Sequence, residues 1–164
     1  MHPAVNLLLL AALVAATPAL AKSSDRQQPM DISADNTDAV MEDNGMSVLK
    51  GNVSIRQGTL EVNADRAEVH RVAGDIQRIV LTGAPARLKQ VSDTGEAMEA
   101  EARQVTYTLS EDIMLLTGAV EVRQPRGTLS GETVRYDIGT GRLNGGGDGQ
   151  RVNMRILPKT AASN

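Results

Sequence analysis

The stretch VLKGNVSIRQGTLEVNADRA, residues 48–67, contains both of the short patterns that decide the fold of this chain. The first pattern is Leu-x-Gly, which begins at residues 49, 81 and 116 and, more weakly, at residue 143. The second pattern runs apolar, any residue, small, acidic, and begins at residues 32, 62, 98 and 129. Two interleaved patterns with one period indicate a structural unit that is used about four times and buries its apolar face against its neighbours.

Apolar and polar residues alternate along each unit, which is typical of β-strands. Leu49, Gly51, Val53 and Ile55 keep one phase, and residues 116–122 repeat it. The glycine in the middle of this phase predicts a bend or a bulge. The alternative interpretation is that it leaves room for something held against the sheet. Turn residues interrupt the alternation about every 8–12 residues, which favours an all-β fold.

The phase of the alternation changes just after the second pattern. Leu60 and Val62 are followed by Ala67 and Val69 on the opposite phase, and residues 129–136 show the same change. A change at the same place in two units predicts a bulge or corner, where the strand changes face or sheet. We expect the acidic residue at each corner to point outward or to accept hydrogen bonds from the backbone. These acidic residues are Asp35, Asp65, Glu101 and Glu132.

The composition limits how the interior can be filled and what the chain can bind. The chain has no Cys, Phe or Trp, and only two Tyr. Stability must therefore come from burial and hydrogen bonding rather than from disulfides. An interior of thin aliphatic side chains predicts an apolar trough that these side chains leave open. The formal net charge of -3 excludes nucleic acid as a partner, because that requires a basic stripe.

The chain divides into a leader, one domain and two short ends. Residues 1–21 form an apolar run that ends in small residues, which is typical of a cleaved secretory signal peptide. No Lys or Arg precedes the run, so an uncleaved anchor is the alternative. We expect residues 22–29 to be disordered, residues 30–157 to form the β domain, and residues 158–164 to be a disordered tail.

No residue pattern predicts a catalytic or metal site. His70 is the only His after the leader, and we interpret it as an exposed strand residue. The chain lacks the G-x-S-x-G motif that presents a nucleophile, and a zinc site cannot be assembled from one His and no Cys. The sequence therefore predicts a protein that is not an enzyme and needs neither a metal nor a cofactor.

The sequence resembles the organic-solvent-tolerance (OstA-like) domain family in residues 48–67, in the second copy around residues 116–118 and in the Gly-rich stretch that begins at residue 145. The resemblance extends over roughly residues 30–157. It implies an open, twisted antiparallel β-jellyroll of about four two-strand units with a V-shaped apolar interior. Two features depart from the family. Interior aromatic residues that are common in relatives are missing here, and the Lys-rich tail is reduced to Lys159.

The resemblance also implies a function in the periplasm. Members of this family bind the acyl chains of lipopolysaccharide (its lipid A part) in the interior and stack end to end as a bridge between the two membranes. The implied partners are further copies of the chain, an inner-membrane-anchored LptC-like component and an outer-membrane LptD-like component. Each buried CH₂ group of an acyl chain contributes ~0.8 kcal/mol, so a lipid with several chains gains enough to leave a membrane.

Two sets of residues are expected to carry this function. Unpaired strand edges add to the strands of partners, so we expect the terminal strands to mediate assembly through Met30, Ile32, Val152, Met154 and Ile156. The apolar residues expected to line the interior are Ile32, Val53, Ile55, Leu60, Val62, Leu81, Met98, Leu116, Val120, Val122 and Leu129. The alternatives are the membrane-anchored partner of the same pathway, a structural β-solenoid with a filled core and no ligand, and a secreted hydrolase that uses carboxylates.

Overall fold

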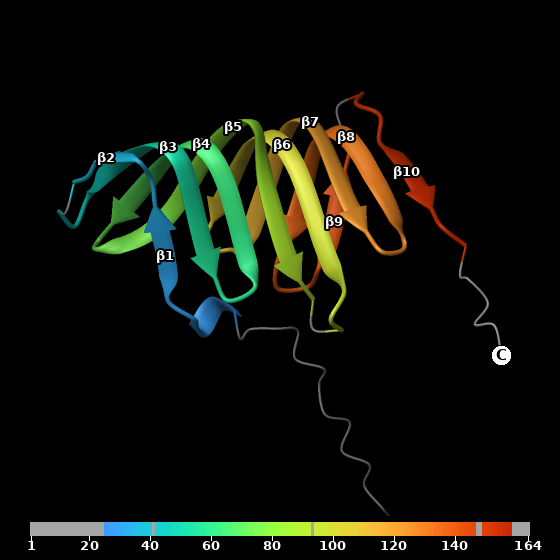
Figure 1. Cartoon of the computed structure of the whole chain (residues 1–164), viewed down its shortest axis with the longest axis horizontal. Helices are drawn as coiled ribbons and strands as arrows, with labels where there is room; N and C mark the ends of the chain where they lie inside the picture. The colour runs from blue at the N-terminus through green and yellow to red at the C-terminus, as the bar shows by residue number, and fades with distance from the viewer. Residues whose placement is uncertain (1–24, 41, 93, 147–148, 159–164) are drawn as a thin grey trace, which may run out of the picture.

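The computed structural model describes residues 25–40, 42–92, 94–146 and 149–158, and the strands in this part of the chain form one open antiparallel sheet (Figure 1). Eight of the ten strands follow the order β1-β3-β4-β5-β6-β7-β8-β10, and the other two, β2 and β9, pair with β3 and β8. The all-β fold class predicted from the sequence is confirmed. The strands are β1 (Met30–Ser33), β2 (Asn36–Asp38), β3 (Gly45–Gln57), β4 (Leu60–Val72), β5 (Asp75–Val91), β6 (Ala97–Thr108), β7 (Ile113–Gln124), β8 (Gly127–Asp137), β9 (Arg142–Gly145) and β10 (Asn153–Ile156).

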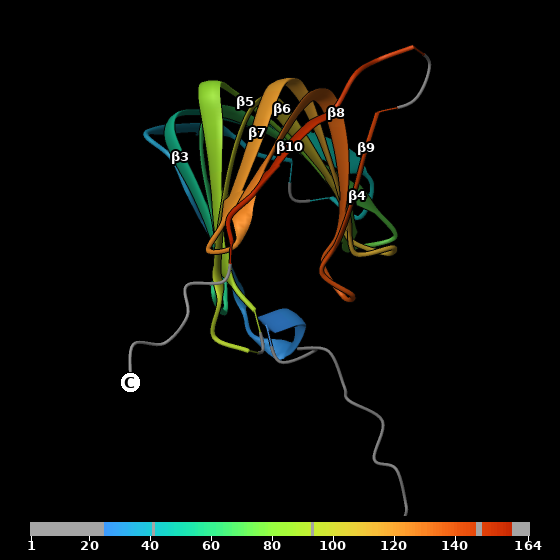
Figure 2. The same ribbon diagram turned by 90° about the vertical axis from the view of Figure 1, so that its right-hand side faces the viewer.

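The six long strands, β3 to β8, bend at a common level, so that the sheet folds into two limbs. The register of each neighbouring pair shifts at this level, as between Lys50 and Val53 of β3. Figure 2 looks along the sheet and shows the limbs as the arms of a V with its corner at the top. Limb A contains residues 53–64, 86–92, 94–102 and 120–131 with β1 and β10. Limb B contains residues 45–50, 66–82, 104–117 and 133–137 with β2 and β9.

Left-handed backbone makes the bend in two of these strands. Gly51 and Gly118 have φ angles of +76° and +83°, and the residues that follow them, Asn52 and Ala119, have φ angles of +45° and +50°. Two successive residues with positive φ mark a bulge, because residues that have a Cβ rarely adopt this left-handed region. A Cβ on Gly118 would lie only 2.8 Å from the Cβ of Arg103. The predicted bend is therefore confirmed, and the Leu-x-Gly pattern marks the corner of the V.

Acidic residues of the second pattern cap the backbone at this corner. Asp65 accepts a hydrogen bond from the N–H of Ala84 (3.1 Å), and Glu132 accepts one from the N–H of Ala119 (3.3 Å). In both cases the acid lies in one strand and the amide lies at the bend of the neighbouring strand. A bulge leaves N–H groups outside the ladder, and the carboxylates satisfy these donors.

The other two acids of the pattern have side-chain partners on the outer surface. Asp35 accepts a hydrogen bond from the amide of Asn52 (2.8 Å), and Glu101 accepts one from Nε of Arg87 (3.2 Å). Asp35 lies beside the bend of β3, and its own N–H donates to the carbonyl oxygen of Gly51 (2.9 Å). The prediction that these acids point outward or accept hydrogen bonds from the backbone is therefore confirmed.

The two ends of the chain are described only in part. The predicted signal peptide, residues 1–21, lies outside the described residues, as do residues 159–164 of the predicted tail. Residues 25–29 belong to the segment that the sequence predicts to be disordered, yet Asp25–Gln27 form a turn of 3₁₀ helix, η1. In the described part of the chain, no helix has the length and apolar character needed to cross a membrane.

Candidate functional site

The two limbs enclose one apolar interior along the length of the sheet. Alternate residues of each strand point between the limbs, as the burial patterns of β4 and β6 show. Ten of the eleven residues predicted to line the interior are at most 7% exposed, and Ile32 packs against the same core. The structure therefore brings the whole predicted lining together. Its contact with lipid stays a prediction.

Limb B supplies interior residues that the predicted lining mostly lacks. Ala67, Val69, Ile79, Val105 and Val134 are at most 6% exposed and belong to the same core. Their signal in the sequence is the change of phase after the corner, which turns the opposite set of side chains inward. Following the alternation through the corner, with its phase reversed, would have identified them.

The interior is filled, so the prediction of an open trough is wrong. Val53 and Val62 of limb A and Leu81 and Leu116 of limb B are each 1% exposed. Thin aliphatic side chains do not hold the limbs apart. They let the limbs approach until the side chains of both reach the close packing that is usual in protein cores.

Both tyrosines lie in this interior, so the expectation that it lacks aromatic residues is also wrong. Tyr107 and Tyr136 are 3% and 6% exposed, and both pair with Met114 across neighbouring strands of limb B. The Tyr136 hydroxyl donates a hydrogen bond to the side-chain oxygen of Gln90, 2.7 Å away in limb A. This buried bond joins the two limbs near their free margins. Burial raises the pKa of Tyr136 to about 12 and also raises the pKa of Tyr107.

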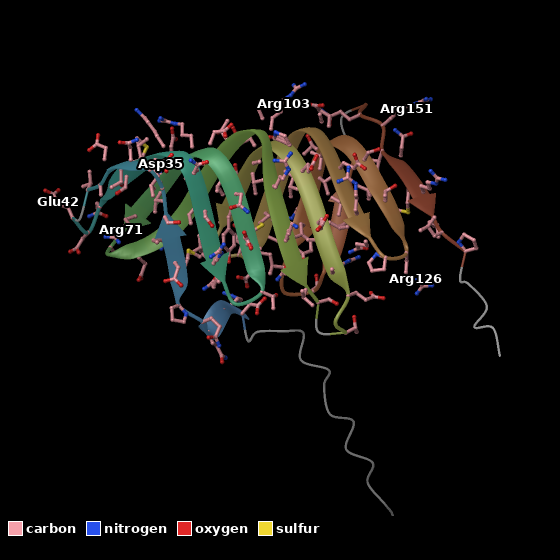
Figure 3. All side chains as sticks on the ribbon, in the orientation of Figure 1. Asp35, Glu42, Arg71, Arg103, Arg126 and Arg151 are labelled. Atoms are coloured by element: carbon pink, nitrogen blue, oxygen red, sulfur yellow. The ribbon has the colours of Figure 1, made fainter. Side chains whose placement is uncertain are left out.

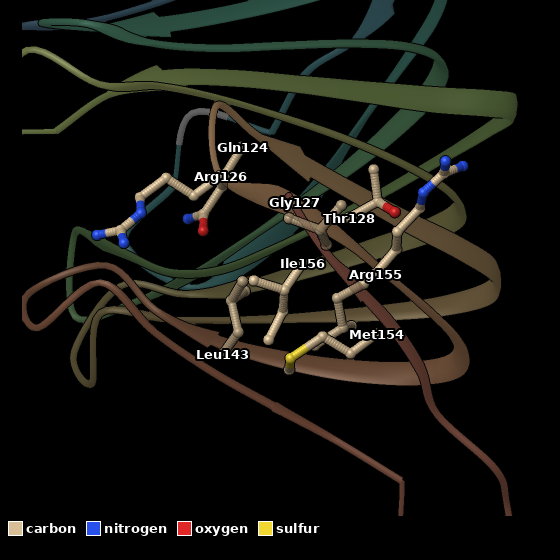
Figure 4. A pocket seen from close by; sticks show the side chains of 10 residues that line it. Gln124, Arg126, Gly127, Thr128, Leu143, Met154, Arg155 and Ile156 are labelled. Carbon is tan, nitrogen blue, oxygen red and sulfur yellow. The ribbon is translucent and has the colours of Figure 1, made fainter. Parts of the chain in front are cut away.

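At the C-terminal end of the sheet the interior is open. A pocket of about 270 Å³ lies there, with β8 and β10 of limb A on one side and Leu143 of β9 on the other (Figure 4). Met154 and Ile156 of β10 line it with side chains that are 65% and 73% exposed. Arg126 and Arg155 lie at its edge with their guanidinium groups directed away from it. This end therefore presents an apolar surface continuous with the core.

Each end of the sheet has an edge strand on both limbs. At the N-terminal end β1 and β2 pair with β3, and at the C-terminal end β9 and β10 pair with β8. Among the predicted assembly residues, Met30 and Ile32 of β1 and Val152, just before β10, are half-buried against the core. Met154 and Ile156 are the exposed members of the set. Their role in assembly stays a prediction.

The outer face carries charges of both signs (Figure 3). Glu101, for example, lies 3.2 Å from Nε of Arg87 and 3.9 Å from a guanidinium nitrogen of Arg123. His70 is half-buried rather than exposed, with its Nε2 atom 3.9 Å from a carboxylate oxygen of Glu68. Among the described residues, no group of three or more His, Asp or Glu side chains could hold a metal ion. Exposed ion pairs such as the one between Glu101 and Arg87 contribute about 0–1 kcal/mol each to stability.

The chain is similar to proteins of one family over most of its length. Residues 31–142 match the family described as "LptA/(LptD N-terminal domain) LPS transport protein". The chain is 33% identical over 158 residues to the lipopolysaccharide export system protein LptA of Escherichia coli K12, an alignment that covers 94% of this chain and 85% of that protein. It is 29% identical to LptA of Haemophilus influenzae, over 93% of this chain and 91% of that protein.

A solved structure shares the fold. The crystal structure of LptH from Pseudomonas aeruginosa, described as the LptA homologous periplasmic component of the lipopolysaccharide transport device, matches with a TM-score of 0.74. The match has 24% sequence identity and covers 82% of this chain and 99% of that chain. The family match, together with the alignments that cover nearly the whole chain, shows that the chain belongs to the LptA/(LptD N-terminal domain) family of lipopolysaccharide transport proteins.

Proposed function

We propose that this protein carries lipopolysaccharide through the periplasm from the inner to the outer membrane, with the acyl chains held between limbs A and B. The observation that supports this most directly is the apolar interior, which extends along β3 to β8 and is open beside β10. The names of the relatives, lipopolysaccharide export system proteins, point the same way. In this proposal residues 1–21 are a cleaved signal peptide, and no residue catalyses a reaction.

The proposed lipid site requires the limbs to separate. The predicted lining residues of the two limbs, such as Val62 and Leu116, are buried against the core. Acyl chains must therefore take the place of side chains of the opposite limb. The gain comes from the lipid, at ~0.8 kcal/mol for each CH₂ group removed from water, while the protein exchanges one apolar neighbour for another.

The strand order supports assembly end to end. Every neighbouring pair in the sheet is antiparallel, and β1 and β10 lie at opposite ends of limb A. With six strands between them, β1 and β10 run in opposite directions. A second copy placed in the same orientation therefore sets its β1 antiparallel to β10 of the first copy. The same holds for β2 and β9 in limb B, so one head-to-tail contact continues both limbs and joins the interiors.

The same edges suit partners that offer a strand. Main-chain hydrogen bonds provide the affinity in strand addition, and side-chain pockets provide the specificity. In this proposal the N-terminal edge, with Met30 and Ile32, and the C-terminal edge, with Met154 and Ile156, bind copies of the chain, an LptC-like component and an LptD-like component. The apolar pocket beside β10 then lies inside the joint between two units.

One observation favours a second candidate function. The filled interior is what a structural β-solenoid module without a ligand would have, and Val53 and Leu81 are only 1% exposed. The two candidates differ in one property that can be measured. A carrier takes up lipopolysaccharide between its limbs, and a structural module does not.

Photocrosslinking tests the lipid site. A photoreactive amino acid replaces Val62 or Val120, which face the interior, and in matched controls it replaces the neighbouring outward residues Glu61 or Glu121. We expect the interior positions to capture lipopolysaccharide in cells and the outward positions to remain unlabelled. Capture at Glu61 and Glu121 but not at the two valines would overturn the assignment of the interior.

Proline substitution tests the edge. Successive N–H groups of a strand point to opposite sides, so of Met154→Pro and Arg155→Pro one removes a bond to β8 and the other removes a donor on the open edge. We expect the variant that keeps the thermal stability of the parent to lose head-to-tail association, measured by light scattering at high concentration. If both variants associate like the parent, β10 is not the docking edge.

A further inference from the structure

Residues 25–28, which we call the strap, cross the open side of the V. Figure 2 shows η1 below the two limbs, between their free margins. Limb A ends here in the β3–β4 turn, around residue 58, and limb B ends in the β6–β7 turn, residues 109–112. The strap contacts both turns, and it lies on the side of the interior opposite the corner.

Several hydrogen bonds fix the strap to limb A. The Thr59 hydroxyl donates to the Asp25 carboxylate (2.5 Å), and Asp25 is only 6% exposed. The side-chain amide of Gln57 donates to the carbonyl oxygens of Arg26 and of the last strap residue (3.4 and 3.2 Å). In the turn between Gln57 and Thr59, Gly58 has a φ of +59°, and a Cβ on it would overlap Asp25. The turn is therefore built to accept the strap at close range.

One ion pair ties the strap to limb B in the described part of the chain. The Arg26 guanidinium binds the carboxylate of Asp112, whose side chain is 12% exposed. The Oδ1 atom of Asp112 has no hydrogen-bond partner among the described residues. Burial raises the pKa of Asp112, and the nearby Arg26 opposes this rise. A carboxylate in this position depends on its cation. This single ion pair attaches the strap to limb B, whereas three hydrogen bonds attach it to limb A.

The strap lies across the lateral route into the interior, between the free margins of the two limbs. The limbs must separate before acyl chains can enter, and near their margins they are joined by the Tyr136–Gln90 hydrogen bond and by the Arg26–Asp112 ion pair. Only the ion pair is at the surface, with the Arg26 side chain 45% exposed. A lipid that approaches from this side therefore meets the ion pair before it meets the buried hydrogen bond.

We propose that the strap is a latch on the side of the interior. It opens when Arg26 leaves Asp112, stays attached to limb A through Thr59 and Gln57, and lets acyl chains enter laterally between the limbs. This inference rests on the proposed function, since it concerns how lipid reaches the interior. The competing route is entry along the axis of the sheet, through the open end beside β10.

The absence of Cys from the chain allows a clean crosslinking test. Arg26→Cys and Asp112→Cys are combined, and the exported protein is treated with a bis-maleimide whose spacer contains a cleavable disulfide. The matched control combines Asp25→Cys with Thr59→Cys, which ties the strap to limb A alone. The probe is purified hexa-acylated lipopolysaccharide, and the rate at which it loads the protein is measured before and after the spacer is reduced.

The latch predicts a different result for each crosslink. Tying the strap to limb B should slow loading by about tenfold or more, because the open state is then rarely populated. Reduction of the spacer should restore the rate in the same sample, which also shows that the variant is folded. The control crosslink should leave the rate unchanged. If the 26–112 crosslinked protein loads as fast as its reduced form, lipid does not enter past the strap and the latch is overturned, while the proposed function stands.

A second pair of variants tests the ion pair without a crosslinker. Arg26→Ala removes the contact with Asp112 and should load lipopolysaccharide several-fold faster than the parent, whereas Arg26→Lys keeps the charge and should load at a rate close to that of the parent. Equal rates for Arg26→Ala and the parent would overturn the latch. A parent protein that never loads lipopolysaccharide would overturn the proposed function, and the latch with it.

Discussion

The hydrogen bond from Tyr136 to Gln90 joins the two limbs inside an apolar interior, so its removal measures how strongly the limbs hold together. Tyr136→Phe keeps the ring and its packing but deprives the Gln90 oxygen of its donor, in a residue that is 8% exposed. A buried hydrogen bond contributes about 1 kcal/mol, and an acceptor left unsatisfied costs about 1–3 kcal/mol. We expect Tyr136→Phe to lower the free energy of unfolding by about 1–2 kcal/mol.

Urea unfolding followed by circular dichroism measures this loss. The matched control is Tyr107→Phe, because Tyr107 is buried in the same row of limb B and its hydroxyl has no partner in limb A among the described residues. We expect this control to change stability by less than about 0.5 kcal/mol. A double-mutant cycle with Gln90→Leu should give a coupling energy of about 1 kcal/mol. Equal losses for the two Phe variants, or a coupling energy near zero, would refute the reasoning.

Three further outcomes follow from the tyrosine and from the corner. The pKa of Tyr136 is raised to about 12, so the stability that its protonated hydroxyl provides is complete below about pH 10 and is lost as the pH rises toward about 12; tyrosinate absorbance of Tyr107→Phe near pH 10 would contradict this. Gly118→Ala meets a side chain at 2.8 Å and should cost about 1–3 kcal/mol, more than Gly141→Ala, which has a similar φ but open space; equal costs in urea unfolding would argue against the crowding. Asp65→Ala should lower the free energy of unfolding by about 1 kcal/mol and Asp65→Asn by less, because the amide oxygen can still accept the backbone hydrogen bond. A lower melting temperature for Asp65→Asn than for Asp65→Ala would contradict the cap.

The corner could be predicted from the sequence because its chemistry is local. Gly51 and Gly118 sit where the backbone turns left-handed, and Asp65 and Glu132 lie next to the change of phase that they stabilise. These signals span a few residues each, and they recur, so the repeat made them visible. The alternation of polar and apolar residues likewise identified which side chains of limb A face inward, because the period of two is a property of a single strand.

The distance between the limbs could not be predicted in this way. Alternation shows which face of a strand is buried, but it does not show how closely the opposite face approaches. The contacts that decide this join residues far apart in the sequence, such as Gln90 with Tyr136 and Arg26 with Asp112. Neither pair has a local signal in the sequence. The strap lies in a polar stretch whose sequence predicts disorder, because its partners Thr59 and Gln57 are far away along the chain and only the fold brings them beside it.

A filled interior suits a carrier better than an open one would. An empty apolar trough leaves side chains without neighbours, and such voids cost packing energy. When Val62 and Leu116 are buried against the opposite limb, the protein without lipid keeps its apolar contacts, and the interior between β3 and β8 exposes no apolar groove to other proteins. In the proposed function, loading breaks those contacts, which subtracts the cost of opening from the gain of ~0.8 kcal/mol for each CH₂ group of the lipid. The net affinity is lower than the buried acyl surface alone predicts, and a carrier that must pass its cargo to the next unit needs that reduction, because lipid held at the full value would not leave.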